Sequence, residues 1–260
     1  SSLLEIVMPT IPTQDLTGRV ALVTGTTSGL GRRFALVLAK AGADVVITGR
    51  RVERLAALEK EIEALGRKAL PLPLDVTDVS SIENVVAKTK ETFGRIDILV
   101  NNAGMNIAES SLRMSPEQYD QMSDTNVKGV FFTSTRVADV MIEQSSGSII
   151  NIGSIGTHTV LPGSALYCTT KAAVGMMTKS HAKEWARYGV NVNAICPGYI
   201  QTELTGEWFK SPGGEKQLKG FPRRRLADED CLDGMTLLLA SDQGKMITGS
   251  IITVDDGQSL

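Results

Sequence analysis

Short apolar runs alternate with helix-type patterns along almost the whole chain. The apolar runs predict buried strands within 19–25, 44–49, 68–76, 96–104, 147–154, 190–198 and 250–257. Between them, apolar residues recur at helical spacing and predict helices near 31–43, 50–66, 79–93, 115–144, 164–188 and 229–241.

Strands that alternate with helices indicate βαβ units, and therefore an α/β fold with a doubly wound parallel sheet and helices on both faces. The strands are almost entirely apolar, as expected for strands covered on both sides. No linker or low-complexity segment divides the chain. We therefore expect a single domain over 18–260, preceded by an N-terminal extension over 1–17.

One stretch departs from the regular alternation. Residues 203–225 combine Trp208 and Phe209 with Gly, Pro and many charges. This composition is typical of a mobile segment, and we expect it to form a flap over a substrate site.

Composition and charge exclude several classes of protein. Of the 260 residues 42% are hydrophobic and 22% charged, and the net charge of −2 provides no basic field for nucleic acid or anionic lipid. The three cysteines (168, 196 and 231) lack the spacing of a disulfide framework or a metal site. No secretory signal or membrane-spanning run is visible, so we expect a cytoplasmic protein. Met8 is a candidate for the natural first residue, with 1–7 left over from cloning.

A glycine-rich turn follows the first predicted strand. Gly25, Gly29 and Gly31 lie in TGTTSGLG (24–31), which also opens the first helix. Glycines there let the backbone approach a pyrophosphate, which is bound by the free N–H groups of the helix N-terminus. Such turns also occur as tight strand–helix crossings that bind nothing, so the motif needs support from the rest of the chain.

The end of the second strand indicates which dinucleotide would bind. NAD-selective folds have an acidic residue there that accepts from the adenine-ribose 2′-hydroxyl. Here Gly49 is followed by Arg50 and Arg51, which favour a 2′-phosphate. We expect NADP(H) in preference to NAD(H), although Arg51 alone would also suit a solvated helix start.

Further polar residues follow the later strands in a regular order. Asp75 and Val76 end the third strand, and NNAG (101–104) ends the fourth. Asn126 lies in the long helix and Ser154 directly follows the fifth strand. Tyr167 and Lys171 are one helical turn apart. A Tyr–Lys pair at this spacing is usually only packing, so its meaning depends on the residues that precede it.

This combination of motifs, in this order, resembles the short-chain dehydrogenase/reductase family from about Gly18 to Gly257. The resemblance implies a Rossmann-type dinucleotide-binding and catalytic domain that uses NAD(P) without a metal. It assigns a catalytic tetrad to Asn126, Ser154, Tyr167 and Lys171, with Asn126 holding a water that links Lys171 to solvent. One departure is Asp256 in VDDG, where many members have Gly; it concerns a turn or a subunit contact. The resemblance also implies a homotetramer, for which Val174, Met176, Met177 and Trp185 would supply apolar surface.

The expected cofactor contacts come from the turn, the strand ends and the Tyr–Lys pair. They are Gly25, Thr27, Ser28, Gly29, Leu30, Gly31, Arg50, Arg51, Asp75, Val76, Asn102, Ala103, Gly104, Tyr167, Lys171, Pro197, Gly198, Ile200 and Thr202. The candidate substrate contacts are His158, Tyr199, Leu204 and Trp208, although a surface position suits His158 better and Trp208 suits a subunit contact equally well.

These residue types suit the reduction of a ketone to a secondary alcohol. The nicotinamide supplies the hydride, Tyr167 would supply the proton, and Ser154 would stabilise the oxygen. A phenol has a pKa near 10, and a charge about 4 Å away contributes roughly 4 kcal/mol, equivalent to about 3 pKa units. Lys171, helped by oxidised nicotinamide, is therefore expected to lower the pKa of the Tyr167 phenol towards neutral pH.

The sequence leaves the substrate open. We expect an NADP(H)-dependent carbonyl reductase, with a gluconate-type sugar-acid dehydrogenase and a 3-oxoacyl-carrier-protein reductase as alternatives. A carrier-protein partner would favour a basic patch such as FPRRRL (221–226), which also reads as a solvated turn. A non-catalytic NADP-binding module is an alternative from a different class, and the presence of both Tyr167 and Lys171 argues against it.

Overall fold

The computed structural model describes residues 10–260, except for the side chains of Glu203 and Leu204. The first nine residues of the expected extension, Met8 included, lie outside the described residues. In the described part, seven strands form one parallel sheet in the order β3-β2-β1-β4-β5-β6-β7. The strands are β1 (Val20–Val23), β2 (Asp44–Gly49), β3 (Ala69–Pro73), β4 (Ile98–Asn101), β5 (Gly147–Ile152), β6 (Val190–Pro197) and β7 (Ile251–Val254).

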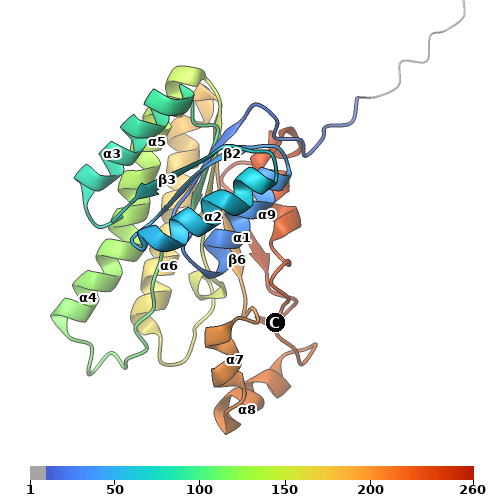
Figure 1. Cartoon of the computed structure of the whole chain (residues 1–260). Coiled ribbons are helices and arrows are strands. Elements are labelled where there is room, and N and C mark those ends of the chain that lie inside the picture. Colours follow the sequence, from blue (N-terminus) through green and yellow to red (C-terminus); the bar gives the residue numbers. More distant parts are fainter. Residues whose placement is uncertain (1–9) are drawn as a thin grey trace, which may run out of the picture.

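Helices cover both faces of this sheet, as the alternating pattern predicts (Figure 1). One face carries α1 (Gly29–Lys40), α2 (Val52–Ala64) and α9 (Asp233–Ala240). The other carries α3 (Val79–Phe93), α5 (Gly129–Gln144) and α6 (Ala165–Trp185), with α4 (Pro116–Ser123) extending α5 at its N-terminal end. Two separate apolar cores fill the two layers, because alternate residues of each buried strand point to opposite faces. The expected α/β fold is therefore confirmed.

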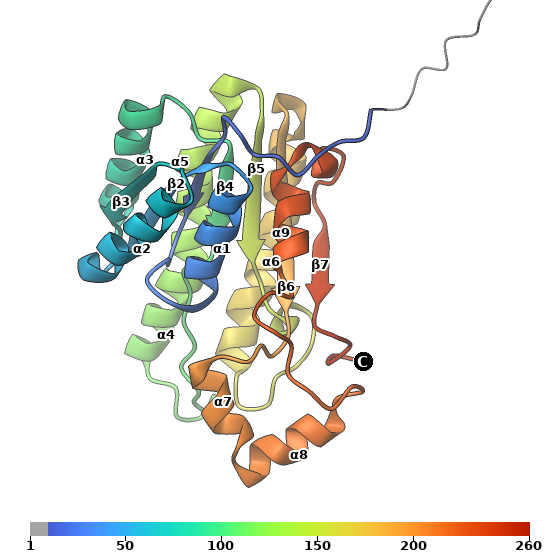
Figure 2. The same ribbon diagram turned by 45° about the vertical axis from the view of Figure 1, so that its right-hand side comes forward.

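The site lies at the carboxyl ends of the strands. Strand β1 pairs with β2 on one side and with β4 on the other, so the strand order reverses beside β1. A crevice forms at such a reversal, and ligands of open α/β sheets bind there. The flap lies beyond the same edge as α7 (Glu203–Phe209) and α8 (Pro212–Gly220), below the ends of β5, β6 and β7 (Figure 2). Much of the segment expected to form the flap is thus helical.

The long predicted helix at 115–144 contains a local change of geometry. Residues Asp124–Lys128 form a π-helical turn between α4 and α5, and Asn126 is at its centre. π-turns are rare inside α-helices, and those that do occur are often found at functional sites. This turn rotates Asn126 inward, where it is 1% exposed.

Two other expectations need correction. The helix expected at 229–241 begins only at Asp233, because residues before it form turns. Val174 and Trp185, expected to supply a surface between subunits, pack within the chain and are 1% and 8% exposed. Met176 does lie on the surface of α6 and is 64% exposed.

Candidate active site

The glycine-rich turn connects β1 to α1 and depends on its glycines for two different reasons. Gly25 and Gly29 have φ of +70° and +54°, a region that L-residues with a side chain rarely adopt. Gly31 has ordinary helical geometry, but a Cβ there would collide with the carbonyl oxygen of Gly25. A Cβ at Gly29 would meet no atom within 4 Å, so its backbone faces open space.

Side-chain hydrogen bonds join this turn to the end of β4. Thr24 Oγ1 accepts from the backbone N–H groups of Asn102 and Ala103, at 3.0 and 2.9 Å. The Asn102 amide donates in return to the carbonyls of Thr24 and Gly25, both at 3.2 Å. These four bonds fix both walls of the crevice before a ligand binds.

A cavity of about 980 Å³ runs from the turn past the ends of β2, β3 and β4. Predicted cofactor residues line it: Gly25, Thr27, Ser28, Gly29, Leu30, Arg50, Arg51, Asp75, Val76, Asn102, Ala103 and Gly104. Ser28 precedes α1 but makes no side-chain cap, so it leaves the first N–H groups of the helix free for an anion. The open backbone at Gly29 and the shape of this crevice fit an extended dinucleotide.

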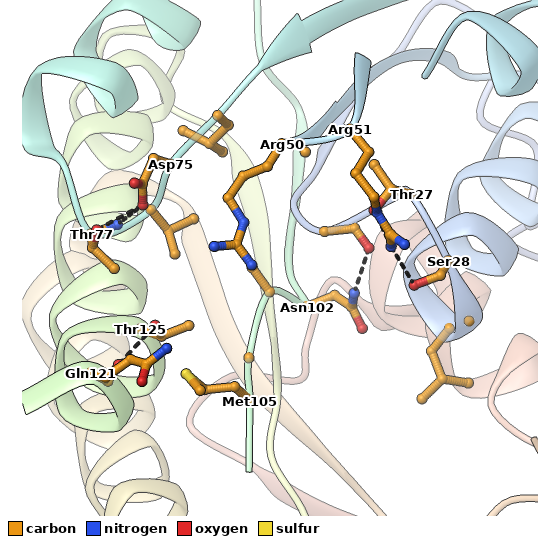
Figure 3. A pocket seen from close by; sticks show the side chains of 18 residues that line it. Thr27, Ser28, Arg50, Arg51, Asp75, Thr77, Asn102, Met105, Gln121 and Thr125 are labelled. Carbon is orange, nitrogen blue, oxygen red and sulfur yellow. Dashed lines mark hydrogen bonds between the residues drawn. The ribbon is translucent and has the colours of Figure 1, made fainter. Parts of the chain in front are cut away.

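The two arginines after β2 lie differently in this cavity (Figure 3). The Arg50 side chain extends into the cavity between Asp75 and Asn102. Arg51 turns towards α1, where its guanidinium donates to Thr27 Oγ1 at 2.8 Å and to Ser28 Oγ at 3.2 Å. Arg50 is therefore the guanidinium presented to a ligand, and Arg51 braces the turn.

One of the two carboxylate oxygens of Asp75 is already hydrogen-bonded within the chain. Its Oδ1 accepts from the backbone N–H and the hydroxyl of Thr77, at 2.9 and 2.7 Å. These bonds hold the carboxylate at the wall of the cavity. Its other oxygen is available to accept a hydrogen bond from a ligand in the cavity, in keeping with the expected cofactor contact at Asp75.

Ser154, Tyr167 and Lys171 line a second cavity of about 330 Å³, which adjoins the first at Leu30, Asn102, Gly104 and Met105. The Ser154 hydroxyl accepts from the Gly156 N–H at 3.0 Å, and it lies near enough to the Tyr167 phenol to lower the pKa of that phenol. Lys171 Nζ donates to the carbonyl of Ile152 at 3.0 Å and lies 5.7 Å from the Tyr167 ring centre. The ends of β5 and α6 thus bring the predicted hydroxyl, phenol and ammonium to one place.

Burial dominates the ionisation of this group. It lowers the pKa of Lys171 to about 8 and raises the pKa of Tyr167 above its ordinary value, against the lowering effect of the Ser154 hydroxyl. This differs from the expected lowering of the Tyr167 pKa. For both groups, the cost of burying the charged form is the largest influence on the pKa.

Asn126 acts on this cluster through its neighbours. Its Oδ1 accepts from the Met105 N–H, and its Nδ2 donates to the Met105 carbonyl, both at 2.8 Å. Nδ2 also donates to Thr170 Oγ1 at 3.1 Å. The side chain therefore connects the loop after β4 to α6, between Tyr167 and Lys171.

Some of the remaining predicted residues lie at the second cavity, and others lie away from it. Pro197, Gly198, Tyr199, Ile200 and Thr202 line the second cavity with Tyr167. His158 lines a separate cavity on the other side of the η2 turn (Ile155–Thr157), where its Nε2 lies 3.4 Å from Thr253 Oγ1. The Trp208 indole packs on α8 and donates to Gln217 Oε1 at 3.0 Å, outside the lining of the second cavity. The side chain of Leu204 is outside the described residues.

Three residues of the site were not predicted. Thr24, Met105 and Thr170 provide the hydrogen bonds that hold the turn, the loop and α6 together. A threonine inside a helix or a turn gives no sign of such a partner in sequence. Met105 takes part through its backbone, which its residue type does not reveal.

A nucleotide crevice joined to a phenol–hydroxyl–ammonium cluster defines a nicotinamide-dependent oxidoreductase. The chain belongs to the short chain dehydrogenase family, whose model matches residues 19–213, and this confirms the resemblance. The family binds a nicotinamide cofactor. Within residues 10–260, no helix is long and apolar enough to cross a membrane.

Named relatives and a solved structure are similar over nearly the whole chain. The 3-oxoacyl-(acyl-carrier-protein) reductase FabG of Thermotoga maritima is 39% identical, over 93% of this chain and 98% of that protein. The gluconate 5-dehydrogenase of Gluconobacter oxydans is 37% identical, over 94% and 95%. The structure of a gluconate 5-dehydrogenase from Burkholderia cenocepacia in complex with NADP and tartrate is 34% identical, covers 94% of this chain and 96% of that chain, and has a TM-score of 0.90.

Proposed function

We propose that the chain is an NADP(H)-dependent oxidoreductase that reversibly reduces a ketone to a secondary alcohol. The observation that carries this proposal is the placement of the Tyr167 phenol and the Ser154 hydroxyl in one cavity that adjoins the nucleotide crevice. Both groups can reach a single carbonyl oxygen. Both belong to rigid elements, since Ser154 follows β5 and Tyr167 is in α6.

The side chains have distinct tasks in this reaction. The bound nicotinamide supplies the hydride to the carbonyl carbon. Tyr167 donates its phenolic proton to the carbonyl oxygen, and its raised pKa keeps that proton in place until the oxygen becomes basic. Ser154 is held by the Gly156 N–H, which occupies a lone pair of its oxygen and leaves the hydroxyl hydrogen free to stabilise the developing charge.

Lys171 stabilises the ionised form of the Tyr167 phenol. Its ammonium donates to the Ile152 carbonyl, and the residue as a whole is only 7% exposed, so the position of the ammonium is fixed. A positive charge there stabilises the phenolate that remains after proton transfer. The remaining N–H donors of Lys171 are available to the nicotinamide ribose hydroxyls.

Arg50 supports NADP(H) as the cofactor. Gly49 ends β2 without a carboxylate, and the Arg50 guanidinium extends into the crevice where a 2′-phosphate would lie (Figure 3). NADP is also the cofactor in the similar gluconate 5-dehydrogenase structure. A guanidinium–phosphate contact is a charge-assisted hydrogen bond, which is among the stronger kinds.

Two narrower substrate classes are consistent with the relatives, a sugar acid and a 3-oxoacyl chain on a carrier protein. The basic run 221–226 was the one feature that favoured a carrier protein. Two of its three arginines, Arg223 and Arg225, pair with Asp256 at 3.3 and 2.7 Å. The Asp256 carboxylate offsets one of the three positive charges of this run and engages two of its arginines, which weakens the case for an acidic partner, so we favour a small free ketone.

We also propose a homotetramer, in keeping with the family. Tyr119, Phe131 and Met176 expose 51%, 42% and 64% of their surface on α4, α5 and α6. Light scattering coupled to size exclusion tests this assembly, and a monomer mass would contradict it.

The function is tested by following NADPH consumption with a panel of simple ketones, sugar-derived ketones and 3-oxoacyl thioesters. We expect turnover with a ketone and a loss of about 10²–10⁴-fold in Tyr167→Phe, which removes the proton donor. Tyr188→Phe, in the η3 turn (Ala186–Tyr188) after α6 and outside the lining of both cavities, serves as the matched control and should retain activity. NADPH binding without turnover of any ketone would instead indicate a non-catalytic module.

A further inference from the structure

The turn that follows β7 holds the backbone at the edge of the second cavity. Gln258 lies in this C-terminal turn (255–258), and its side chain is buried, with 8% of the residue exposed. Its Oε1 accepts from the Tyr199 N–H at 2.6 Å, and its Nε2 donates to the Tyr199 carbonyl at 3.0 Å. A Cβ at Gly198 would collide with the same amide, so the chain passes close to Gln258 there.

The same turn also holds the far end of the flap. Gln258 Nε2 lies 3.5 Å from the Arg225 carbonyl, and the Asp256 carboxylate pairs with the guanidinium groups of Arg223 and Arg225. Asp256 adopts φ of +55°, which is uncommon for a residue with a side chain. The C-terminal turn therefore contacts the segments at both ends of the flap.

Tyr199 is the point at which these contacts meet. Backbone bonds join the two ends of the flap, from Ala227 N to the Tyr199 carbonyl at 3.0 Å and from Gln201 N to the Ala227 carbonyl at 2.9 Å. The Tyr199 ring packs on Phe209 and Phe221, which are buried, with centroid distances of 5.4 and 5.8 Å. Tyr199 also lines the second cavity together with Tyr167 and Ser154.

We propose that Gln258 is a positioning residue for the ketone-binding half of the site, and that it acts on the flap through Tyr199. The inference rests on the proposed function, because it takes the second cavity as the place of the ketone. The Gln258 amide fixes the Tyr199 backbone on both sides, and Tyr199 fixes the flap helices through Phe209 and Phe221. Gln258 does not line the nucleotide crevice, so its effect on the ketone should exceed its effect on the cofactor, whose expected contacts near Tyr199 are confined to the second cavity.

The experiment replaces the amide and measures binding of the two substrates separately. Gln258→Met keeps the bulk and removes the hydrogen bonds, whereas Gln258→Ala removes both. Gln243→Ala is the matched control, because the Gln243 amide also donates to a backbone carbonyl, that of Pro12 at 2.9 Å, at the opposite edge of the sheet. We expect Gln258→Met to raise the KM for the ketone about tenfold or more, with smaller changes in kcat and in the Kd for NADPH. Gln243→Ala should leave all three constants unchanged.

Hydrogen exchange of the full-length protein gives a readout that does not depend on turnover. In Gln258→Met, amides over residues 199–227 should exchange faster than in the unaltered chain and in Gln243→Ala, with exchange in α1 and β1 unchanged. Unchanged flap exchange together with an unchanged ketone KM would overturn the proposal, as would a rise in the NADPH Kd equal to the rise in KM. If the unaltered chain reduces no ketone, the proposed function fails, and faster flap exchange would still support the positioning role of Gln258.

Discussion

The side-chain amide of Asn126 donates to Thr170 Oγ1 across 3.1 Å, and the Thr170 hydroxyl in turn donates to the Tyr167 carbonyl at 2.8 Å. Asn126 reaches α6 because the π-turn rotates it inward from the long helix. This chain of bonds determines where the helical turn carrying Tyr167 and Lys171 lies relative to the loop after β4. Asn126 therefore acts in the site as a tie between elements.

The two threonines between Tyr167 and Lys171 should consequently differ in importance. Thr170→Val leaves the buried Asn126 amide without one of its two acceptors, so we expect a loss of about 1–3 kcal/mol in the free energy of unfolding. Thr169→Val removes only an exposed bond to the Ala165 carbonyl and should cost less than about 0.5 kcal/mol. Urea unfolding of both variants measures the difference, and equal losses would contradict the role given to Thr170.

Replacement of Arg50 tests the choice of cofactor. In Arg50→Ala we expect the KM for NADPH to rise about 10–100-fold, the cost of a charge-assisted hydrogen bond, with little change for NADH. Arg67→Ala is a suitable control, because Arg67 bonds backbone carbonyls of Gly42 and Gly66 away from the crevice. Steady-state kinetics with both cofactors provides the measurement. Equal losses towards NADPH and NADH would argue against a 2′-phosphate contact.

The parts of the fold that could be predicted are those that depend on local pattern. The apolar runs predicted the sheet and the helices on both of its faces, because strands that are buried on both sides are apolar along their whole length. The glycine turn, Arg50 and the Tyr167–Lys171 spacing were predictable because each occupies a fixed place at a strand end or on one helical turn.

The parts that could not be predicted depend on contacts between distant segments. The hydrogen bond between Asn126 and Thr170 joins residues 44 positions apart, and the Gln258–Tyr199 contact joins residues 59 apart. The direction of the Tyr167 pKa depends on burial, which becomes known only when the chain is folded. His158 was a substrate candidate by its nearness to Ser154 in sequence, but the η2 turn directs it to the β7 side.

Two glycine-to-alanine variants should change stability in opposite directions. In Gly31→Ala the added methyl meets the Gly25 carbonyl inside a packed turn, so we expect a loss of about 1–3 kcal/mol and much weaker NADPH binding. In Gly234→Ala the methyl meets no atom within 4 Å in the helix α9, so we expect a gain of about 0.5–1 kcal/mol. Thermal unfolding and fluorescence titration with NADPH measure both effects. A Gly31→Ala protein that binds NADPH normally would contradict the close packing of this turn.

The buried ammonium of Lys171 should make the stability of the protein depend on pH in a definite window. Its pKa is about 8 in the folded chain, whereas the ordinary value of 10.5 applies after unfolding. Between these values the unfolded chain binds more protons, so the free energy of unfolding gains a term that rises with pH from about 8 to about 10.5, by up to about 3 kcal/mol. Below pH 8 both states are charged, and the full cost of burying the ammonium is present.

Lys171→Met removes this term and keeps an apolar chain of similar length. Tyr167 and Cys196, whose pKa values are raised by burial, add a change of the opposite sign at high pH in both proteins. The informative quantity is therefore the difference in unfolding free energy between the unaltered chain and the variant, measured by urea unfolding at several pH values. We expect this difference to shift in favour of the unaltered chain as the pH rises above about 8, and to stay constant for the control Lys179→Met, whose side chain is exposed on the same helix. Parallel pH profiles for the unaltered chain and Lys171→Met would show that the ammonium is not destabilised by its burial.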